Sequence, residues 1–135
     1  MGPAEARERF AREPVARLAS VGPDGAPHLV PIVFVLEGET IYSVVDRKPK
    51  RSTRLRRIEN LRSHPRAAVL ADHYEPDWSR LWWVRADGSA RVLDPGEEEA
   101  VRAVALLAAR YPQQQAAGEV LAVDVERWSG WSAEE

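Results

Sequence analysis

The chain of 135 residues carries a formal net charge of −2, with 44% hydrophobic and 30% charged residues. This is the composition of a soluble globular protein, long enough for a single domain spanning residues 1–135. The absence of cysteine excludes disulfides, thiolate metal sites and cysteine nucleophiles. No apolar run approaches the roughly 20 residues that cross a bilayer, so we expect a cytoplasmic protein with no membrane partner.

The first part of the chain predicts a helix followed by three strands. Pro3–Ala11 places a proline and an acid in the first turn of a helix. Val15–Val21 alternates and ends at the turn signal GPDGAP, and His28–Leu36 follows, so the two segments are predicted to pair as a hairpin. Thr40–Asp46, rich in β-branched and aromatic residues, predicts a third strand. Pro31 lies inside the second strand, which indicates an edge or a bulge there.

A second helix and a fourth strand are predicted after a basic segment. Leu55, Ile58 and Leu61 recur at roughly helical spacing, and Pro65 ends the pattern. Arg66–Tyr74 then predicts a strand.

Ser79–Leu93 predicts a hairpin with Asp87 and Gly88 at its tip. Trp82 and Trp83 are adjacent on its first strand and must face opposite sides of the sheet. One of them can fill the core, while the other must meet a partner subunit, another element or a flat ligand.

The last helix is predicted with Asp94 as its cap, Pro95 at its first position and three glutamates in its first turn. Its predicted buried stripe consists of Val101, Val104, Ala105 and Ala108. Glu119–Trp128 alternates and predicts the final strand. Six or seven strands with few helices predict a mainly β (α+β) fold, an antiparallel barrel with peripheral helices, split or irregular at Pro31.

The basic segment holds seven cationic side chains between Arg47 and Arg57, with no acid among them. One interpretation is a solvated charged loop. Another is a phosphate pocket, because the segment leads into the N-terminus of a helix, where unpaired N–H groups and the helix dipole favour anions. The charge is local, the protein is net acidic and no aromatic residues are interleaved, so we expect no nucleic-acid partner.

Other chemistry is sparse in the sequence. The three histidines, at positions 28, 64 and 73, have no metal-ligand spacing, so no metal site is predicted. Ser20 and Ser43 lack a G-x-S-x-G context, so no hydrolase triad is indicated.

Two long segments resemble one family. GETIYSVVDRKPKRSTRLRRIENLRSHPRAAVLADHY and RLWWVRADGSARVL are similar to the pyridoxamine-5′-phosphate-oxidase-like split β-barrel proteins, and look closest to their actinobacterial, coenzyme F420-dependent branch. The segment N-L-R-x-x-P-R-A-A-V is the most characteristic part. The resemblance implies a split barrel that forms a homodimer, with two cofactors at the subunit interface.

The resemblance also implies which residues bind the cofactor. Arg57, eight positions before Pro65, would grip the phosphate with a neighbouring basic residue beside it, and the strand Ile41–Asp46 would line the ribityl chain. The strand around Val30–Ile32 would face the ring. The implied set is Val30, Pro31, Ile32, Ser43, Val44, Val45, Lys48, Lys50, Arg56, Arg57 and Trp83.

The implied activity is that of an F420-dependent oxidoreductase that transfers a hydride between the reduced deazaflavin and a small unsaturated substrate. The alternatives are an FMN-dependent oxidase or reductase of the same fold and a non-catalytic F420-binding or storage protein. The cofactor would supply the chemistry, so no catalytic side chain is expected to be visible in the sequence. Seven cations exceed what the single phosphate of FMN needs, which favours F420, whose tail carries carboxylates.

Overall fold

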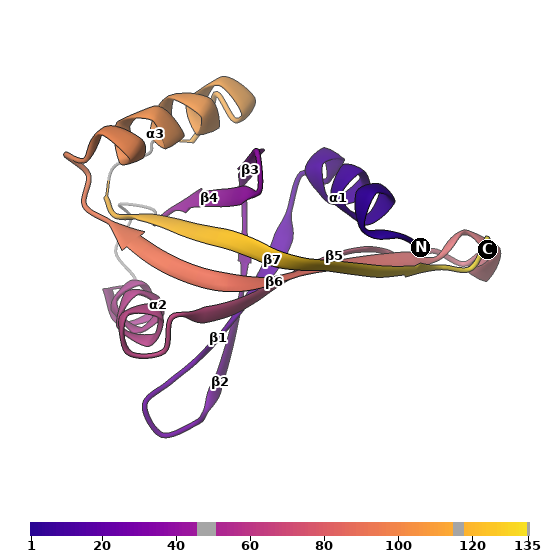
Figure 1. Cartoon of the computed structure of the whole chain (residues 1–135), viewed down its shortest axis with the longest axis horizontal. Helices are drawn as coiled ribbons and strands as arrows, with labels where there is room; N and C mark the ends of the chain where they lie inside the picture. Colours follow the sequence, from indigo (N-terminus) through magenta and orange to yellow (C-terminus); the bar gives the residue numbers. More distant parts are fainter. Residues whose placement is uncertain (46–50, 115–117, 135) are drawn as a thin grey trace.

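A computed structural model describes residues 1–45, 51–114 and 118–134, without the side chains of residues 51–55. Its strands form one seven-stranded curled sheet, in the order β2-β1-β5-β6-β7-β4-β3, in which all neighbours are antiparallel. Both chain ends lie at the tip of the long ribbon formed by β5, β6 and β7 (Figure 1). The predicted mainly β split barrel with peripheral helices is confirmed as this half-barrel.

The elements follow the predicted order with few changes. The strands are β1 (Ala16–Val21), β2 (Pro27–Ile32), β3 (Val35–Glu37), β4 (Thr40–Val44), β5 (Arg66–His73), β6 (Trp82–Leu93) and β7 (Val120–Ser132). The helices are α1 (Pro3–Arg12), α2 (Arg51–Ser63) and α3 (Glu98–Arg110), with the short 3-10 helix η1 (Trp78–Arg80) before β6. The predicted hairpin of β1 and β2 is confirmed, and β2, which contains Pro31, lies at an edge of the sheet.

One face of the sheet, here called the inner face, carries the larger core. It is built from alternate residues of the strands, such as Leu18, Val69 and Val84, together with Phe10 of α1 and Leu61 of α2. Each of these five side chains is 1% exposed or less. A second cluster lies under α3. Its members include Tyr42, Val44, Leu93, Ala103, Leu107 and Val120.

The face of the sheet opposite the inner face is covered by α3 over part of its area. Over the remaining area, no helix of the described residues packs on it. We call this remaining area the open face. It is defined by Arg17, Leu29, Pro31, Leu70, Trp83, Arg85, Ser129 and Trp131, which are related by cross-strand register and belong to neither core cluster. Leu29 is 67% exposed and Trp131 is 43% exposed, so this face presents large apolar side chains without a cover in the single chain.

The two adjacent tryptophans of β6 face opposite sides of the sheet, as predicted. Trp82 packs against the inner core, where the Arg9 guanidinium lies 5.4 Å from the centre of its ring. Trp83 lies on the open face, where Arg85 approaches its ring at 5.9 Å.

The predicted hairpin over Ser79–Leu93 is wrong. β6 runs straight through Asp87 and Gly88, and the register with β7 shifts at that point. A Cβ atom built on Gly88 would lie 2.1 Å from the Asp124 carbonyl oxygen. The glycine therefore permits a close approach of two backbones at a bulge, rather than a turn.

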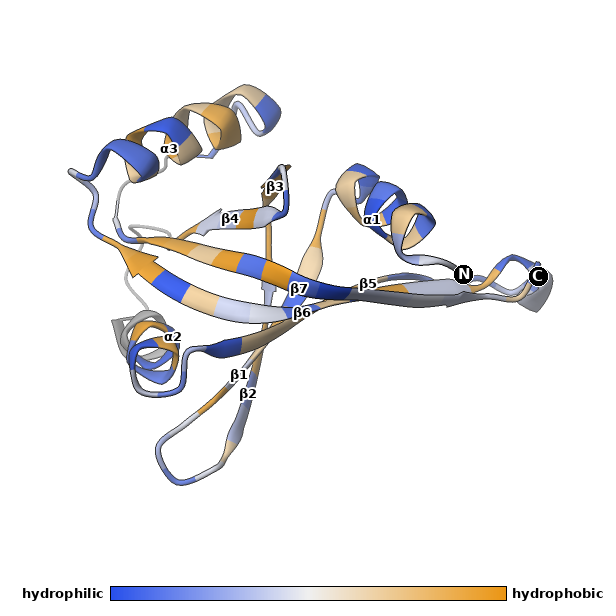
Figure 2. Ribbon diagram, in the orientation of Figure 1, coloured by the Kyte–Doolittle hydropathy of each residue, from blue (hydrophilic) through white to orange (hydrophobic). Residues whose placement is uncertain are grey.

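The bulge reverses the alternation of β7. Val125 before it and Trp128 after it both pack against the inner core, although the two residues are an odd number of positions apart. Figure 2 shows hydrophobic and hydrophilic segments alternating along β6 and β7. The extra residue of β7, Glu126, lies between the partners of Asp87 and Gly88 and lets both halves of the strand keep their apolar side chains on one face.

Two details of α3 also differ from the predictions. The helix starts at Glu98, and its N-cap is Glu97, not Asp94. Asp94 precedes the helix, and its backbone N–H donates to Glu97 Oε2 at 2.6 Å. The buried residues of α3 are Ala100, Ala103 and Leu107. Of the predicted stripe, only Val104 packs against the cluster under α3, where it is partly buried. The rest of the stripe is wrong, and Val101 is 58% exposed.

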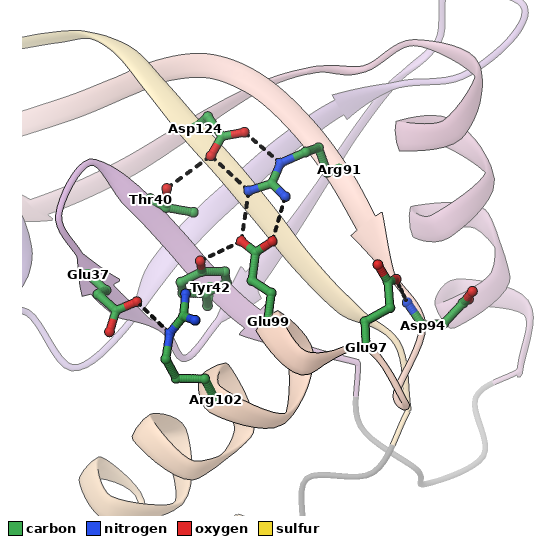
Figure 3. A network of polar contacts seen from close by, with 9 residues as sticks. All are labelled: Glu37, Thr40, Tyr42, Arg91, Asp94, Glu97, Glu99, Arg102 and Asp124. Carbon is green, nitrogen blue, oxygen red and sulfur yellow. Dashed lines mark hydrogen bonds and ion pairs between the residues drawn. The ribbon is translucent and has the colours of Figure 1, made fainter.

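A network of ion pairs joins α3 to the sheet (Figure 3). Arg91 of β6 donates to both oxygens of Glu99, at 2.8 and 2.9 Å, and to both oxygens of Asp124, at 2.7 and 3.0 Å. The Tyr42 hydroxyl donates to Glu99 at 2.6 Å, and Thr40 donates to Asp124 at 2.9 Å. Hydrogen bonds from Arg91 and then from Tyr42 lower the pKa of Glu99 to about 2.

We expect this network to make stability fall in acid. The folded pKa of Glu99 lies below its ordinary value of 4.5, so its contribution is complete above about pH 5 and is lost as the pH falls towards 2. The free energy of unfolding of wild type should fall between pH 7 and pH 3. In Glu99→Gln this fall should be smaller by about 1–2 kcal/mol, after allowance for solvent screening. Urea unfolding at pH 7 and pH 3 measures it. The neighbouring, exposed Glu98 supplies the control Glu98→Gln, and an equal effect of both variants would contradict the role of the network.

Candidate functional site

A pocket of about 610 Å³ opens between the β1–β2 turn and α2. The turn contributes Gly22, Pro23, Asp24 and Ala26, β2 contributes Pro27 and His28, and α2 contributes Arg56, Glu59 and Asn60. The three helix residues are spaced three and four positions apart, which places them on one helical face. The pocket is therefore formed where one face of α2 meets a tight turn.

The turn that forms one wall is held by its own hydrogen bonds. The Gly22 N–H donates to the Ala26 carbonyl at 2.9 Å, and the Asp24 carboxylate accepts from the Ala26 N–H at 3.1 Å. Gly25 has a φ of 81°, a conformation that favours glycine. On the other wall, the buried Asn60 donates to Ser20 Oγ at 3.3 Å, which ties α2 to β1.

Arg57 places a positive charge beside this pocket without a counter-ion. Its side chain is half-buried, its Nε atom is shielded from solvent, and no hydrogen bond or ion pair joins it to another described residue. Burial lowers the pKa of Arg57. A half-buried guanidinium without a carboxylate partner is unfavourable, and an anionic ligand would offset that cost.

His28 is the second polar side chain with a shielded, unpaired atom at this pocket. Its ring lines the pocket, and its Nδ1 atom has no hydrogen-bond partner among the described residues. Burial lowers the pKa of His28, and the positive charges of Arg56 and Arg57 lower it further. The electrostatic field at His28 is therefore dominated by cations of α2, although Asp24 and Glu59 also line the pocket.

A second, smaller hollow lies on the open face. It has a volume of about 340 Å³ and is lined by Leu70, Asp72, Tyr74, Trp83 and Arg85. Asp72 pairs with Arg17 at 3.3 Å, and Arg85 pairs with Asp87 at 3.0 Å. The flat, half-exposed ring of Trp83 is suited to stacking against another planar group. The hollow and the pocket share no lining residue.

The structure brings together only part of the set of residues predicted from the sequence. Arg56 lines the pocket, Arg57 lies beside it and Trp83 lines the hollow. Val30 and Ile32 point into the inner core, whereas Pro31 between them is exposed on the open face. Ser43, Val44 and Val45 are 3%, 3% and 1% exposed, so their side chains are buried in the single chain. Lys48 and Lys50 lie outside the described residues.

The sequence interpretation missed several residues that line these sites. His28 was grouped with the scattered histidines, and Asn60 was not singled out. A signal for His28 was present, because it shares the strand parity of Val30 and Ile32 and so had to point towards the inner face. Tyr74, Asp72 and Arg85 could not be related to Trp83 without the register between β5 and β6.

Some site types are absent from the residues that the structure describes. Within 1–45, 51–114 and 118–134, no group of three or more histidine, aspartate or glutamate side chains is placed to hold a metal ion. No helix in this part of the chain is long and apolar enough to cross a membrane.

The sequence from residue 3 to residue 132 matches the family described as pyridoxamine 5′-phosphate oxidase. The chain belongs to this family. Its members include oxidoreductases. No protein of curated function matches the sequence.

Several solved structures share this fold, and some of them are named for the group that they bind. A conserved hypothetical protein from Mycobacterium tuberculosis superposes with a TM-score of 0.75 at 22% identity, over 99% of this chain and 86% of that chain. A FAD-binding protein from Mesorhizobium loti gives 0.73 at 21% identity, over 96% and 94%. HutZ, the haem storage protein from Vibrio cholerae, gives 0.70 at 16% identity, over 98% and 95%. At these identities the similarity shows that this chain has the same fold.

Proposed function

We propose that this member of the pyridoxamine 5′-phosphate oxidase family binds a phosphate-bearing flavin or deazaflavin, with coenzyme F420 preferred, and acts as an oxidoreductase. The observation that carries the proposal is Arg57, a half-buried guanidinium whose Nε atom is shielded and which has no described counter-ion, beside a pocket of about 610 Å³. A phosphate there would accept charge-assisted hydrogen bonds from Arg56 and Arg57, and an arginine can make two at once.

The residues present fit such a group. The glycine-containing turn from Gly22 to Pro27 lets backbone approach a ligand closely, and Asn60 holds α2 in place through Ser20. On the open face, the ring of Trp83 would contact a planar ring system. When bound, a reduced deazaflavin would supply a hydride to a small unsaturated substrate. The chain's own part is to bind, to orient and to exclude water, so no side chain is assigned as a general acid or base.

F420 is preferred to FMN on grounds of charge. The phosphate of FMN carries about −2, which two or three cations neutralise, whereas the chain offers seven between Arg47 and Arg57. F420 adds a glutamyl tail with several carboxylates, for which Lys48 and Lys50 are the proposed partners. An FMN-dependent enzyme, and a protein that binds the cofactor without turnover, are the alternatives. Reduced F420 with a panel of unsaturated substrates tests for turnover.

We expect F420 to bind more tightly than FMN, and by a larger factor at low salt, because exposed charges are screened as ionic strength rises. Fluorescence titration at two ionic strengths measures both affinities. The double variant Lys48→Ala with Lys50→Ala should weaken the binding of F420 by less than about fivefold for each lysine removed. It should leave the affinity for F420 without its glutamyl tail unchanged. Equal or tighter binding of FMN in wild type would overturn the preference for the deazaflavin.

We also propose that two chains pair through the open face. Light scattering at micromolar concentration should then give about twice the chain mass of 15.1 kDa. Leu29→Glu places a charge on this face, where Leu29 is 67% exposed, and should shift the population towards the monomer. Val101→Glu is the matched control, because Val101 is 58% exposed on α3. A monomeric wild type, or equal effects of both variants, would contradict the proposed interface.

A further inference from the structure

The two nitrogens of the His28 ring lie in different surroundings. Nδ1 is shielded from solvent and has no partner in the described part of the chain, whereas Nε2 is not sealed in this way. A proton on Nδ1 would be a buried donor without an acceptor, which is unfavourable. The neutral ring, which lines the pocket, therefore keeps its single proton on Nε2.

The charged groups around the ring also favour its neutral form. From α2, Arg56 and Arg57 disfavour a third positive charge at His28. Glu59 of α2 and Asp24 of the turn are the acids that line the same pocket, but the hydrogen bond that Asp24 accepts within the described residues comes from the Ala26 backbone, not from the imidazole. The other polar groups on this face, Ser20 and Asn60, are bonded to each other.

We propose that His28 is a neutral hydrogen-bond donor of this pocket, which presents its Nε2–H to the phosphate of the bound cofactor. The proposal rests on the proposed function for the identity of the anion, but not for the state of the ring. Arg57 supplies charge, whereas His28 supplies a directed donor.

The first test needs no ligand. Nitrogen-15 NMR of the three histidines, assigned by the single variants His28→Gln, His64→Gln and His73→Gln, should show His28 as the neutral Nε2–H tautomer at pH 7. An imidazolium, or the Nδ1–H tautomer, would overturn the assignment. The exposed His64 serves as the reference for the spectrum of an accessible ring.

The second test separates a donor from a space-filling side chain. His28→Leu should weaken F420 roughly tenfold to a hundredfold, the loss expected for one hydrogen bond to a charged group, whereas His28→Gln, which keeps an N–H donor, should recover most of it. Equal affinities of the two variants would overturn the proposed role of His28. If FMN binds and F420 does not, the same pair of variants tested with FMN still decides the role of His28, and only the preference for F420 has failed.

Discussion

Gly88→Ala should lower the free energy of unfolding by about 3 kcal/mol or more, an effect as large as the loss of a major core side chain. The added Cβ would lie 2.1 Å from the Asp124 carbonyl oxygen, 2.9 Å from the carbonyl carbon and 3.1 Å from Val125 Cα. All three are backbone atoms of β7, so no side-chain rotation can relieve the overlap. The strands β6 and β7 would have to separate at the bulge.

Urea unfolding of the two proteins measures this effect, provided the slope of the transition is unchanged. Gly96→Ala is the control, because a Cβ at Gly96 meets no atom within 4 Å, and it should change stability by less than about 0.5 kcal/mol. A Gly88→Ala protein as stable as wild type would show that β6 and β7 do not approach each other in this way.

The second large effect is expected at Arg57, where binding and stability should respond in opposite directions. Arg57→Met removes a half-buried charge that has no described partner, and its flexible apolar side chain can fill much of the same space. The ligand-free variant should therefore be at least as stable as wild type. Its affinity for the phosphate-bearing cofactor should fall roughly tenfold to a hundredfold, since a hydrogen bond to a charged group contributes about 1.5–3 kcal/mol.

Thermal unfolding without ligand and a fluorescence titration measure the two halves of this prediction. Arg62→Met is the matched control on the same helix, because Arg62 is exposed and pairs only loosely with Asp94, at 3.9 Å. It should leave cofactor affinity within about twofold. A ligand-free Arg57→Met protein that is markedly less stable than wild type would indicate that Arg57 has a structural role instead.

The order of strands and helices could be predicted because it depends on local patterns. The turn between β1 and β2 follows from GPDGAP. Pro31, which cannot donate a ladder hydrogen bond, indicated an edge or a bulge, and β2 lies at an edge. The opposite orientations of Trp82 and Trp83 follow from strand geometry alone.

The errors arose where a residue's role depends on a distant strand. Asp87-Gly88 has the composition of a hairpin tip, and only the approach of the Asp124 carbonyl distinguishes the bulge from a turn. The predicted stripe of α3 is rotated by one position, because apolar residues lie on more than one side of this helix and only the sheet beneath it selects the face that contains Ala103 and Leu107.

Of the candidate site, only the basic residues could be predicted from the sequence. The basic residues Arg56 and Arg57 are conspicuous in the sequence, and the family resemblance assigned them to a phosphate. His28 and Asn60 reach the same pocket from β2 and α2, and no local pattern relates them, because their proximity depends on how α2 packs across the inner face.

The central claim is that the pocket beside Arg57 holds the phosphate of a flavin-like cofactor. It is tested most directly by comparing pairs of ligands that differ only in the phosphate-bearing part: FMN with riboflavin, and F420 with its phosphate-free deazaflavin, each titrated against wild type and Arg57→Met. We predict that the phosphate-bearing member of at least one pair binds wild type more than tenfold tighter, and that Arg57→Met lowers this ratio by roughly tenfold to a hundredfold. Equal affinities within both pairs for wild type, or a ratio that is unchanged in Arg57→Met, would contradict the claim.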